Sequence, residues 1–297
     1  MTNRRRATAT TRPEAAMLNA LSVDVEDWFQ VGAFEGVIAR DTWDSLPHRV
    51  ERNSDAVLAL FDQAGVKATF FTLGWVAERY PALIRRIADA GHEVASHGWD
   101  HRRVFTLEAA TFRADLERAR IAIEDACGQS PIGYRAPSFS IDRRTPWAHR
   151  VLAEEGYAYS SSVAPIRHDH YGWPEAPRFA FRPVEGASLI ELPVTTVEIS
   201  GRRMAAGGGG FFRLLPYHFS SWAISRVNRD EGRPAIFYFH PWEIDPGQPR
   251  VSRAPLKSRL RHYSRLSAMQ GKLRKLLGSH EWGRTDAVVA RERELLS

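Results

Sequence analysis

Hydrophobic and polar residues follow two alternating patterns along this chain. Short runs of apolar, β-branched residues, of which LNALSVDV at 18–25 is the first, are separated by longer segments with apolar residues at helical spacing. In the segment 49–64, for example, Val50, Val57 and Phe61 recur at intervals of seven and four residues. This alternation is typical of βα units around a parallel sheet or barrel, so we predict an α/β fold.

The same patterns predict the order of the elements. Strands are expected at 18–25, 66–73, 93–96, 132–135, 157–161, 189–194 and 235–240. Helices are expected at 49–64, 75–90, 107–127, 145–155 and 214–229. Because no repeat or change in composition interrupts these elements, we expect a disordered N-terminal extension at 1–16, one barrel domain at 17–250 and a basic helical extension at 251–297.

Composition limits the chemistry that the chain can support. Hydrophobic residues make up 43% of the 297 residues and aromatic residues 11%, as in a globular protein with a sizeable core. The single cysteine, Cys127, allows no intrachain disulfide and no thiolate metal cluster. A metal ion would therefore need histidine and carboxylate ligands.

Charge and hydropathy give an expectation for location. The net charge is +6 and the sequence pI is about 9.7, with the excess concentrated towards the two ends. The basic N-terminal residues precede no apolar stretch of the kind found in secretory signals. No run of about 18 apolar residues predicts a membrane span. We therefore expect a cytoplasmic protein.

Acidic side chains gather where the first predicted strand ends, which is where barrels and open α/β sheets place their active sites. In SVDVEDWF, Asp24 ends the strand, and Glu26 and Asp27 follow it. Carboxylates this close repel one another and raise a pKa unless a cation neutralises them. The motif therefore indicates a cation site, with a solvated acidic turn as the alternative.

A histidine pair follows another predicted strand, in the motif SHGWDH. His97 and His101 are four residues apart, a spacing that places two imidazoles on one side of a helical turn. Together with the acidic cluster, the pair predicts a site of two histidines and one carboxylate. Zinc hydrolases use this pattern because it leaves a coordination position open for water.

Further motifs supply weaker candidates. His240 ends an apolar strand in FYFHPWE, and Arg135 in GYRAPSFS can hold a carboxylate bidentately and keep it ionised. His168 and His170 alternate in a loop, where a metal site is the less favoured interpretation. The glycine run 207–210 precedes no Lys-Ser or Lys-Thr pair, so it favours an active-site loop over a phosphate-binding loop.

Taken in order, the motifs SVDVEDWF, ATFFTLGW, SHGWDH, GYRAPSFS and FYFHPWE resemble those of the polysaccharide deacetylase family, the NodB-homology enzymes of carbohydrate esterase family 4. The resemblance extends over residues 18–242. The segments RVERN and FHPWEIDPGQPR and the basic tail resemble the branch associated with exosortase (PEP-CTERM) and exopolysaccharide gene clusters, with its DUF3473-like C-terminus. Membership implies a deformed (β/α) TIM-like barrel of the NodB-homology type, which agrees with the alternation of strands and helices.

The resemblance implies a role for each motif residue. Asp24 would be the catalytic base, oriented by Arg135. His240 would be the general acid. His97 and His101 would be metal ligands.

The chain departs from the family pattern at two positions. Most members have two adjacent aspartates, whereas Val25 follows Asp24 here. Glu26 is the favoured third ligand, because alternation along a strand keeps it on the same face as Asp24, but Asp27 remains open. Ser160 stands where relatives usually carry an aspartate, which puts the usual support of the catalytic histidine in question.

Residues close to these motifs are candidates for contact with a sugar. They are Trp28, Trp75, Trp99, Pro137, Ser138 and Phe139. A backbone N–H near Ser138 would hold the oxyanion. The aromatic members can equally be ordinary core residues.

The function that the resemblance implies is metal-dependent N-deacetylation of N-acetylhexosamine units in an exopolysaccharide or its precursor. The expected cofactor is a divalent ion, Zn²⁺ before Co²⁺, Ni²⁺ or Mn²⁺, and the expected partner is an N-acetylated poly- or oligosaccharide. Two alternatives stay open. One is an allantoinase-like cyclic amidohydrolase, and the other is a catalytically inactive carbohydrate-binding protein of the exopolysaccharide assembly machinery.

The basic tail predicts a surface of its own. Apolar residues recur at helical spacing among lysines and arginines, at Leu256, Leu260, Tyr263, Leu266, Met269 and Leu273. Such an amphipathic helix either packs on the barrel or makes peripheral contact with anionic inner-membrane lipid or with exopolysaccharide assembly proteins. Aromatic residues are not interleaved with the charges, so nucleic acid is not expected as a partner.

Overall fold

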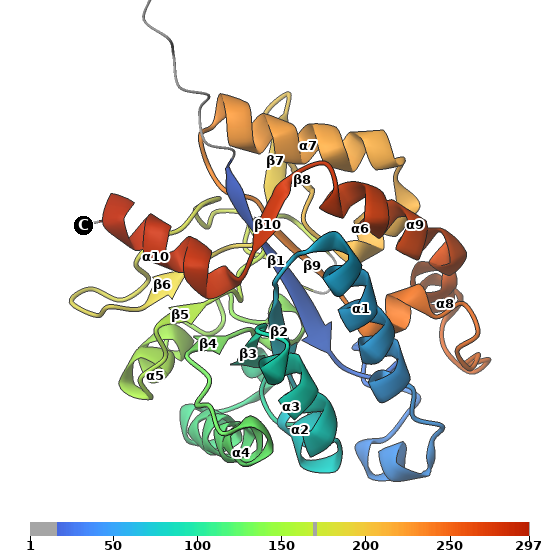
Figure 1. The fold of residues 1–297 in the computed structure, drawn as a ribbon. Helices are drawn as coiled ribbons and strands as arrows, with labels where there is room; N and C mark the ends of the chain where they lie inside the picture. Colours follow the sequence, from blue (N-terminus) through green and yellow to red (C-terminus); the bar gives the residue numbers. More distant parts are fainter. Residues whose placement is uncertain (1–16, 169–170, 297) are drawn as a thin grey trace, which may run out of the picture.

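The computed structural model describes residues 17–168 and 171–296, so the expectations for residues 1–16 and for His170 lie outside the described residues. Within these ranges a sheet of eight strands forms the centre, and helices surround it (Figure 1). The strands are β1 (Leu18–Val25), β2 (Thr69–Thr72), β3 (Glu93–Ser96), β4 (Gly133–Tyr134), β5 (Tyr159–Ser160), β6 (Ile190–Glu191), β9 (Ile236–Phe239) and β10 (Glu281–Gly283).

Strand β1 is the hub of the sheet, because it pairs in parallel with β2, β9 and β10. From β1 the order continues through β2, β3, β4 and β5 to β6, again with parallel pairing. The segment after β6 returns towards β9, where the Thr195 backbone N–H donates to the Ile236 carbonyl oxygen (3.3 Å). The predicted α/β fold is therefore confirmed, as a parallel sheet curved into a deformed, incompletely closed barrel.

Helices cover the outside of this sheet (Figure 1). The α-helices are α1 (Val50–Ala64), α2 (Gly74–Arg79), α3 (Pro81–Asp89), α4 (Ala109–Cys127), α5 (Ala148–Glu154), α6 (Gly209–Leu214), α7 (Tyr217–Asp230), α8 (Leu256–Tyr263), α9 (Leu266–Leu277) and α10 (Thr285–Leu295). Short 3-10 helices lie at η1 (Arg40–Ser45), η2 (Val104–Thr106), η3 (Pro137–Phe139) and η4 (Pro241–Ile244). None of the helices in the described ranges is both long enough and apolar enough to span a bilayer.

Coverage on both faces explains the sequence of β1. Ala20, Leu21, Val23 and Val25 are all fully buried. Strands of a parallel sheet are buried on both faces, so they appear as near-continuous apolar runs rather than as a strict alternation. Asp24 is the one charged residue of this strand, and it belongs to the site described below.

Two helices differ from the prediction for local reasons. The segment 75–90 was expected to be one helix, but it forms α2 and α3, because Pro81 occupies the first turn of a new helix. The basic segment after Leu256 is likewise divided, because Arg265 adopts a left-handed conformation (φ 54°) between α8 and α9.

Three strands were not predicted. β7 (Thr196–Ile199) and β8 (Arg202–Ala205) form a separate antiparallel hairpin. Near the C-terminus, β10 pairs with β1 and leads into α10, so the segment that was expected to be a helical extension contributes a strand to the central sheet.

Candidate active site

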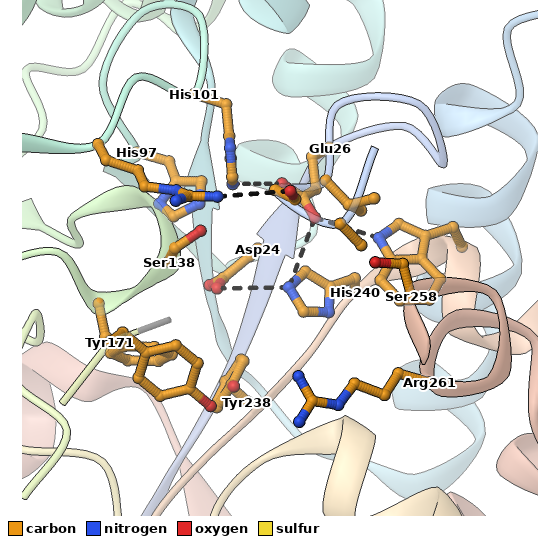
Figure 2. Close-up of a pocket in the computed structure, with 16 residues that line it drawn as sticks. Asp24, Glu26, His97, His101, Ser138, Tyr171, Tyr238, His240, Ser258 and Arg261 are labelled. Atoms are coloured by element: carbon orange, nitrogen blue, oxygen red, sulfur yellow. Dashed lines mark hydrogen bonds and ion pairs between the residues drawn. The ribbon is translucent and has the colours of Figure 1, made fainter. Parts of the chain in front are cut away.

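The predicted chemical residues meet at the carboxyl ends of the strands. Asp24 is the next-to-last residue of β1, His97 directly follows β3, Arg135 directly follows β4 and His240 directly follows β9. Carboxyl ends of parallel strands lie at one edge, so residues far apart in sequence share one pocket. Figure 2 shows Asp24, Glu26, His97 and His240 around this pocket.

Three buried side chains form a candidate metal site. Potential ligand atoms of Glu26, His97 and His101 all lie within 4.8 Å of one another. His101 Nε2 is 2.9 Å from Glu26 Oε2, yet this buried oxygen accepts no hydrogen bond of acceptable geometry. A nitrogen and an oxygen that face each other in this way, each with a lone pair to offer, are arranged to bind one cation between them.

Surrounding groups orient the candidate ligands. His97 Nδ1 lies 2.8 Å from the Arg135 carbonyl oxygen, which can only accept, so Nδ1 carries the proton and Nε2 keeps its lone pair. The Trp242 indole donates to Glu26 Oε1 (3.1 Å), which leaves Oε2 for a ligand. Such partners fix the tautomer and direction of metal ligands.

The protonation states also suit a cation. Burial raises the pKa of Glu26, but the facing His101 and His240 outweigh it and bring the pKa down to about 2. Burial lowers the pKa of His97 to about 4. Near neutral pH the carboxylate is therefore ionised and the imidazole neutral, as metal ligands must be. A donor set of two nitrogens and one oxygen fits a divalent ion such as zinc.

The histidine pair converges through a loop rather than the expected helical turn. Gly98 and His101 both have left-handed conformations, with φ values of 74° and 61°. The Trp99 backbone N–H donates to Asp115 Oδ2 (3.0 Å), which holds the loop against α4. A Cβ at Gly98 would lie 2.8 Å from the same oxygen, so glycine is required there.

Asp24, which lines the pocket, is held by a buried arginine. Arg135 Nη1 donates to Asp24 Oδ1 (2.7 Å), in a single contact rather than a bidentate one. The guanidinium also donates to the hydroxyls of Ser22 (2.8 Å) and Ser161 (3.0 Å) and is fully buried. Asp24 Oδ2 is thereby turned towards His240, whose Nε2 lies 3.9 Å away (Figure 2).

His240 lies between two acidic groups. Its Nε2 faces Glu26 Oε1 (3.5 Å), and its Nδ1 is 2.8 Å from Glu243 Oε1. Burial lowers the pKa of His240, but Glu26, Glu243 and Asp24 together outweigh burial and raise the pKa to about 9. The imidazole therefore carries a proton at neutral pH that it can donate into the pocket.

Asp27 is placed elsewhere. Its Oδ2 accepts the backbone N–H groups of Arg49 (2.6 Å) and Val50 (2.9 Å), at the start of α1. The Trp28 indole N–H donates to the Pro47 carbonyl oxygen (3.0 Å), and the ring is packed in the core. Among the described residues, therefore, Glu26 joins the histidine pair, whereas Asp27 supports a helix and Trp28 supports the core.

The other proposed sugar contacts divide between pocket and core. Ser138 and Phe139 line the pocket, both with left-handed φ values (55° and 49°), but Pro137 is buried and does not line it. Trp99 lies under the Arg118 guanidinium (3.5 Å to the ring centroid), and Trp75 packs in the aromatic cluster of the core. Neither tryptophan lines the pocket.

Ser160 takes no visible part in the site. Its hydroxyl donates to Ser162 Oγ (2.8 Å) and is fully buried. In the described part of the chain, His240 has no hydrogen bond or ion pair with Ser160, and its Nδ1 partner is Glu243.

Several residues of the site were not predicted. Glu243 had a signal, because it lies three residues after His240 in FHPWE, the spacing of a capping box, and its Oε1 accepts the His240 backbone N–H (3.2 Å) as in that motif. Tyr171, Ser258 and Arg261 also line the pocket. These three residues lie outside the motifs, so nothing in the sequence indicated that they would line the pocket.

Comparisons with known proteins agree with this architecture. The family model described as polysaccharide deacetylase matches residues 38–159, and the model described as a domain of unknown function, DUF3473, matches residues 161–290. The chain is 31% identical over 107 residues to the peptidoglycan deacetylase of Helicobacter pylori, covering 36% of each protein. It is 37% identical over 108 residues to the chitooligosaccharide deacetylase of a Bradyrhizobium strain, covering 36% of this chain and 47% of that protein. These alignments thus span between a third and a half of each relative.

A solved structure resembles the whole fold. The crystal structure of a polysaccharide deacetylase, described as putative, from Mycobacterium smegmatis superposes with a TM-score of 0.60 at 20% sequence identity, over 99% of this chain and 96% of that one. The site draws on both matched segments. His97, His101 and Arg135 lie in the first, His240 lies in the second, and Asp24 precedes both.

Proposed function

Since the chain carries a polysaccharide deacetylase segment followed by a DUF3473 segment, we propose that it is a metal-dependent deacetylase that hydrolyses the acetamide of N-acetylated saccharides. The observation that carries this proposal is the convergence of the Glu26, His97 and His101 cluster with Asp24 and His240 in one pocket. A hydrolase of amides needs a base, an acid and an electrophile in reach of one bond, and this pocket has residues for each.

The triad of Glu26, His97 and His101 would hold a divalent ion, for which we propose Zn²⁺ ahead of Co²⁺, Ni²⁺ or Mn²⁺. When bound, such an ion supplies Lewis-acid polarisation of the acetamide carbonyl and makes a water molecule more acidic. The chain's own residues then move the protons.

Asp24 is placed to accept the proton of the attacking water, because Arg135 holds its Oδ1 and leaves Oδ2 facing the pocket. His240 then gives its Nε2 proton to the amide nitrogen as the C–N bond breaks, so acetate and a free sugar amine leave. We assign the backbone N–H of Ser138 to the oxyanion. The adjacent N–H of Phe139 already donates to the Ala136 carbonyl oxygen (3.0 Å).

The direct test measures bound metal, then acetate release from N-acetylglucosamine oligomers by wild type and by Asp24→Asn. We expect about one metal ion per chain, acetate release by wild type, and a loss of at least about 100-fold in Asp24→Asn with its metal retained. Wild type that binds metal but cleaves only a cyclic amide would favour the amidohydrolase alternative. Wild type that binds saccharide without metal or turnover would favour the inactive binding protein.

For the natural substrate we propose N-acetylhexosamine units of an exopolysaccharide or its precursor. The support is the similarity of RVERN, FHPWEIDPGQPR and the basic tail to the exopolysaccharide-associated branch, together with the DUF3473 match. Acetate release from N-acetylhexosamine oligomers should exceed that from peptidoglycan fragments of equal acetyl content. Preference for peptidoglycan would overturn this assignment.

We also propose a cytoplasmic location with peripheral contact to anionic inner-membrane lipid or to exopolysaccharide assembly proteins. The support is α8, which exposes Leu256 (68%) and Leu260 (58%) among basic residues that include Arg259. Ser258 and Arg261 of the same helix line the pocket, so a bound surface would lie close to the site.

Liposome flotation tests the lipid contact. Wild type should float with anionic vesicles at low salt, and the double variant Leu256→Ser/Leu260→Ser should not. Leu295→Ser is the matched control, because Leu295 is equally exposed (68%) but lies on α10. Equal flotation of all three proteins, or of none, would contradict the proposal.

A further inference from the structure

A buried carboxylate fixes the ring of His240 from behind. Glu243 Oε1 lies 2.8 Å from His240 Nδ1 and also accepts the His240 backbone N–H (3.2 Å). An ionised carboxylate can only accept, so Nδ1 must carry its proton towards Glu243. This directs Nε2 into the pocket, where it faces Asp24 and Glu26. Glu243 itself is fully buried and does not line the pocket.

A buried arginine holds this carboxylate in turn. Arg213 Nε donates to Glu243 Oε2 (2.6 Å), and only 1% of Arg213 is exposed. Its remaining N–H groups donate to the carbonyl oxygens of Arg261 (3.1 Å), His262 (3.0 Å) and Ser264 (2.6 Å). Arg213 therefore connects the carboxylate to the junction of α8 and α9, and its own position is fixed by that junction.

Stacked aromatic rings also hold the His240 ring in place. The Trp242 ring lies nearly parallel to the His240 ring, with centroids 5.0 Å apart, and the His262 ring stacks on Trp242 with centroids 4.1 Å apart. Burial lowers the pKa of His262 to about 3, so this ring is neutral, and its Nε2 is 2.6 Å from Gln248 Oε1. Residues of the C-terminal segment thus pack behind the histidine as well as bonding to it.

The backbone of α6 makes room for this arrangement. A Cβ on Gly209 would lie only 2.3 Å from Glu243 Oε1, whereas a Cβ on Gly210 would meet nothing within 4 Å. Glycine at 209 is therefore required by the position of Glu243. Glu243, Arg213 and Gly209 all lie within the residues that the DUF3473 model matches.

We propose that Glu243, held by Arg213, is the positioning residue of His240 and does the work that the aspartate expected at Ser160 would do. This inference rests on the proposed function, because it assigns the orientation of the proposed general acid. It also gives the DUF3473 segment a part in catalysis. That segment brings both the histidine and the buried pair that aims it, so the first matched segment alone has an incomplete site.

Two substrates with different leaving groups can show whether Glu243 positions His240 or only stabilises the fold. Cleavage of an acetamide needs a proton on the departing nitrogen, which His240 supplies, whereas 4-nitrophenyl acetate loses a stable phenolate that needs no proton. Misaligning His240 should therefore slow the amide far more than the activated ester. Damage to the metal site or to the fold should slow both.

The experiment compares kcat and KM of the metal-loaded full chain on an N-acetylglucosamine oligomer and on 4-nitrophenyl acetate. For Glu243→Gln and Glu243→Asp we expect kcat on the amide to fall by about 10- to 100-fold, as for other residues that orient a catalytic group. KM on the amide and kcat on the ester should change by less than about threefold. The second variant keeps the negative charge beside Arg213 but shortens the reach to His240, so either variant that folds decides the question.

Two controls complete the design. Glu292→Gln removes a carboxylate of a similar pair with Arg233 (3.0 Å) on α10, and both activities should stay within about twofold of wild type. In His240→Ala, adding Glu243→Gln should cause no further loss on the amide, because the two residues act as one unit.

The outcomes distinguish this inference from the proposed function. Wild type that cleaves neither substrate would refute the proposed function. Wild type that cleaves both, with Glu243 variants that slow amide and ester equally or leave the amide unchanged, would refute the positioning role alone. A further loss in the double variant with His240→Ala would refute it as well.

Discussion

At the scale of single residues, neighbouring carboxylates acquire different contacts from the geometry of a strand end. Asp24 and Glu26 are two residues apart and both line the pocket, although the chain already turns at Val25, where the Glu26 N–H donates to the Asp24 carbonyl oxygen (3.0 Å). Asp27, one residue on, turns the other way and accepts the first backbone N–H groups of α1. The sequence supported this choice through alternation, but only the contacts of Asp27 separate the two acids.

Exchange of each acid for its amide tests that separation. Glu26→Gln should lower zinc affinity by at least about tenfold, because it replaces a ligand oxygen by an amide. Asp27→Asn should bind metal as wild type does but lose about 1 kcal/mol of stability, as expected when a helix loses its cap. Metal content after dialysis and thermal unfolding of the apo-proteins measure the two effects. Loss of metal from Asp27→Asn with retention by Glu26→Gln would reverse the assignment.

The sequence indicated those site residues that follow strands. His97, His101, Arg135 and His240 could be located because apolar runs end just before them. Arg213 could not, because its role depends on contacts to carbonyl groups about 50 residues further along the chain. A pattern of hydrophobic periodicity carries no information on such long-range polar contacts.

At the scale of elements, the glycine run before α6 shows how close packing can resemble a loop motif. A Cβ on Gly207 would lie 2.2 Å from the Ile236 carbonyl oxygen, and one on Gly208 would lie 2.9 Å from the Tyr238 ring. The run thus allows the backbone to lie directly against β9. Composition alone suggested an active-site loop, because glycine serves both purposes.

Alanine substitution in this run should have opposite effects at adjacent positions. Gly209→Ala should destabilise the protein by about 1–3 kcal/mol, because the added methyl meets Glu243 Oε1, which Arg213 holds in place. Gly210→Ala should be neutral or stabilising by up to about 1 kcal/mol, because alanine favours the helix and has free space. Urea unfolding of the two variants gives the comparison. Equal destabilisation would show that Glu243 is not fixed as described.

The basic tail was predicted correctly as helical but incorrectly as continuous. Leu266, Met269 and Leu273 of α9 are buried in the main core, so this half packs on the barrel. Leu256 and Leu260 of α8 remain exposed. Periodicity continued across the break, because a left-handed residue at Arg265 changes the direction of the chain without changing which residues are apolar.

At the scale of the whole molecule, the two ends of the barrel have separate tasks. The carboxyl ends of the strands carry the proposed chemistry, and the amino ends carry a buried network that joins the C-terminus to the sheet. Glu93, at the start of β3, accepts the hydroxyls of Thr69 (2.5 Å) and Tyr159 (2.8 Å). It also accepts the backbone N–H of Asp286 (3.2 Å), in the first turn of α10.

This network should make the stability of the fold depend on pH. Burial, with a smaller contribution from Asp286, raises the pKa of Glu93 from 4.5 to about 7. Between these values the native protein binds the proton more tightly than the unfolded chain. The contribution of protonated Glu93 to the stability of the fold is therefore complete below pH 4.5 and is lost as the pH rises through 7. For this one group, the loss of stability between pH 5 and pH 8 is about 2.5 kcal/mol.

Urea unfolding of wild type and Glu93→Gln across that range isolates the effect. The variant cannot ionise, so its free energy of unfolding should fall less steeply with pH than that of wild type, whatever its absolute stability. Glu117→Gln, at an exposed position of α4, should keep the wild-type slope. Parallel slopes for wild type and Glu93→Gln would mean that Glu93 titrates alike in both states. The difference in slope between wild type and Glu93→Gln should be absent below pH 4.5, where the carboxyl group of Glu93 is protonated both in the native protein and in the unfolded chain.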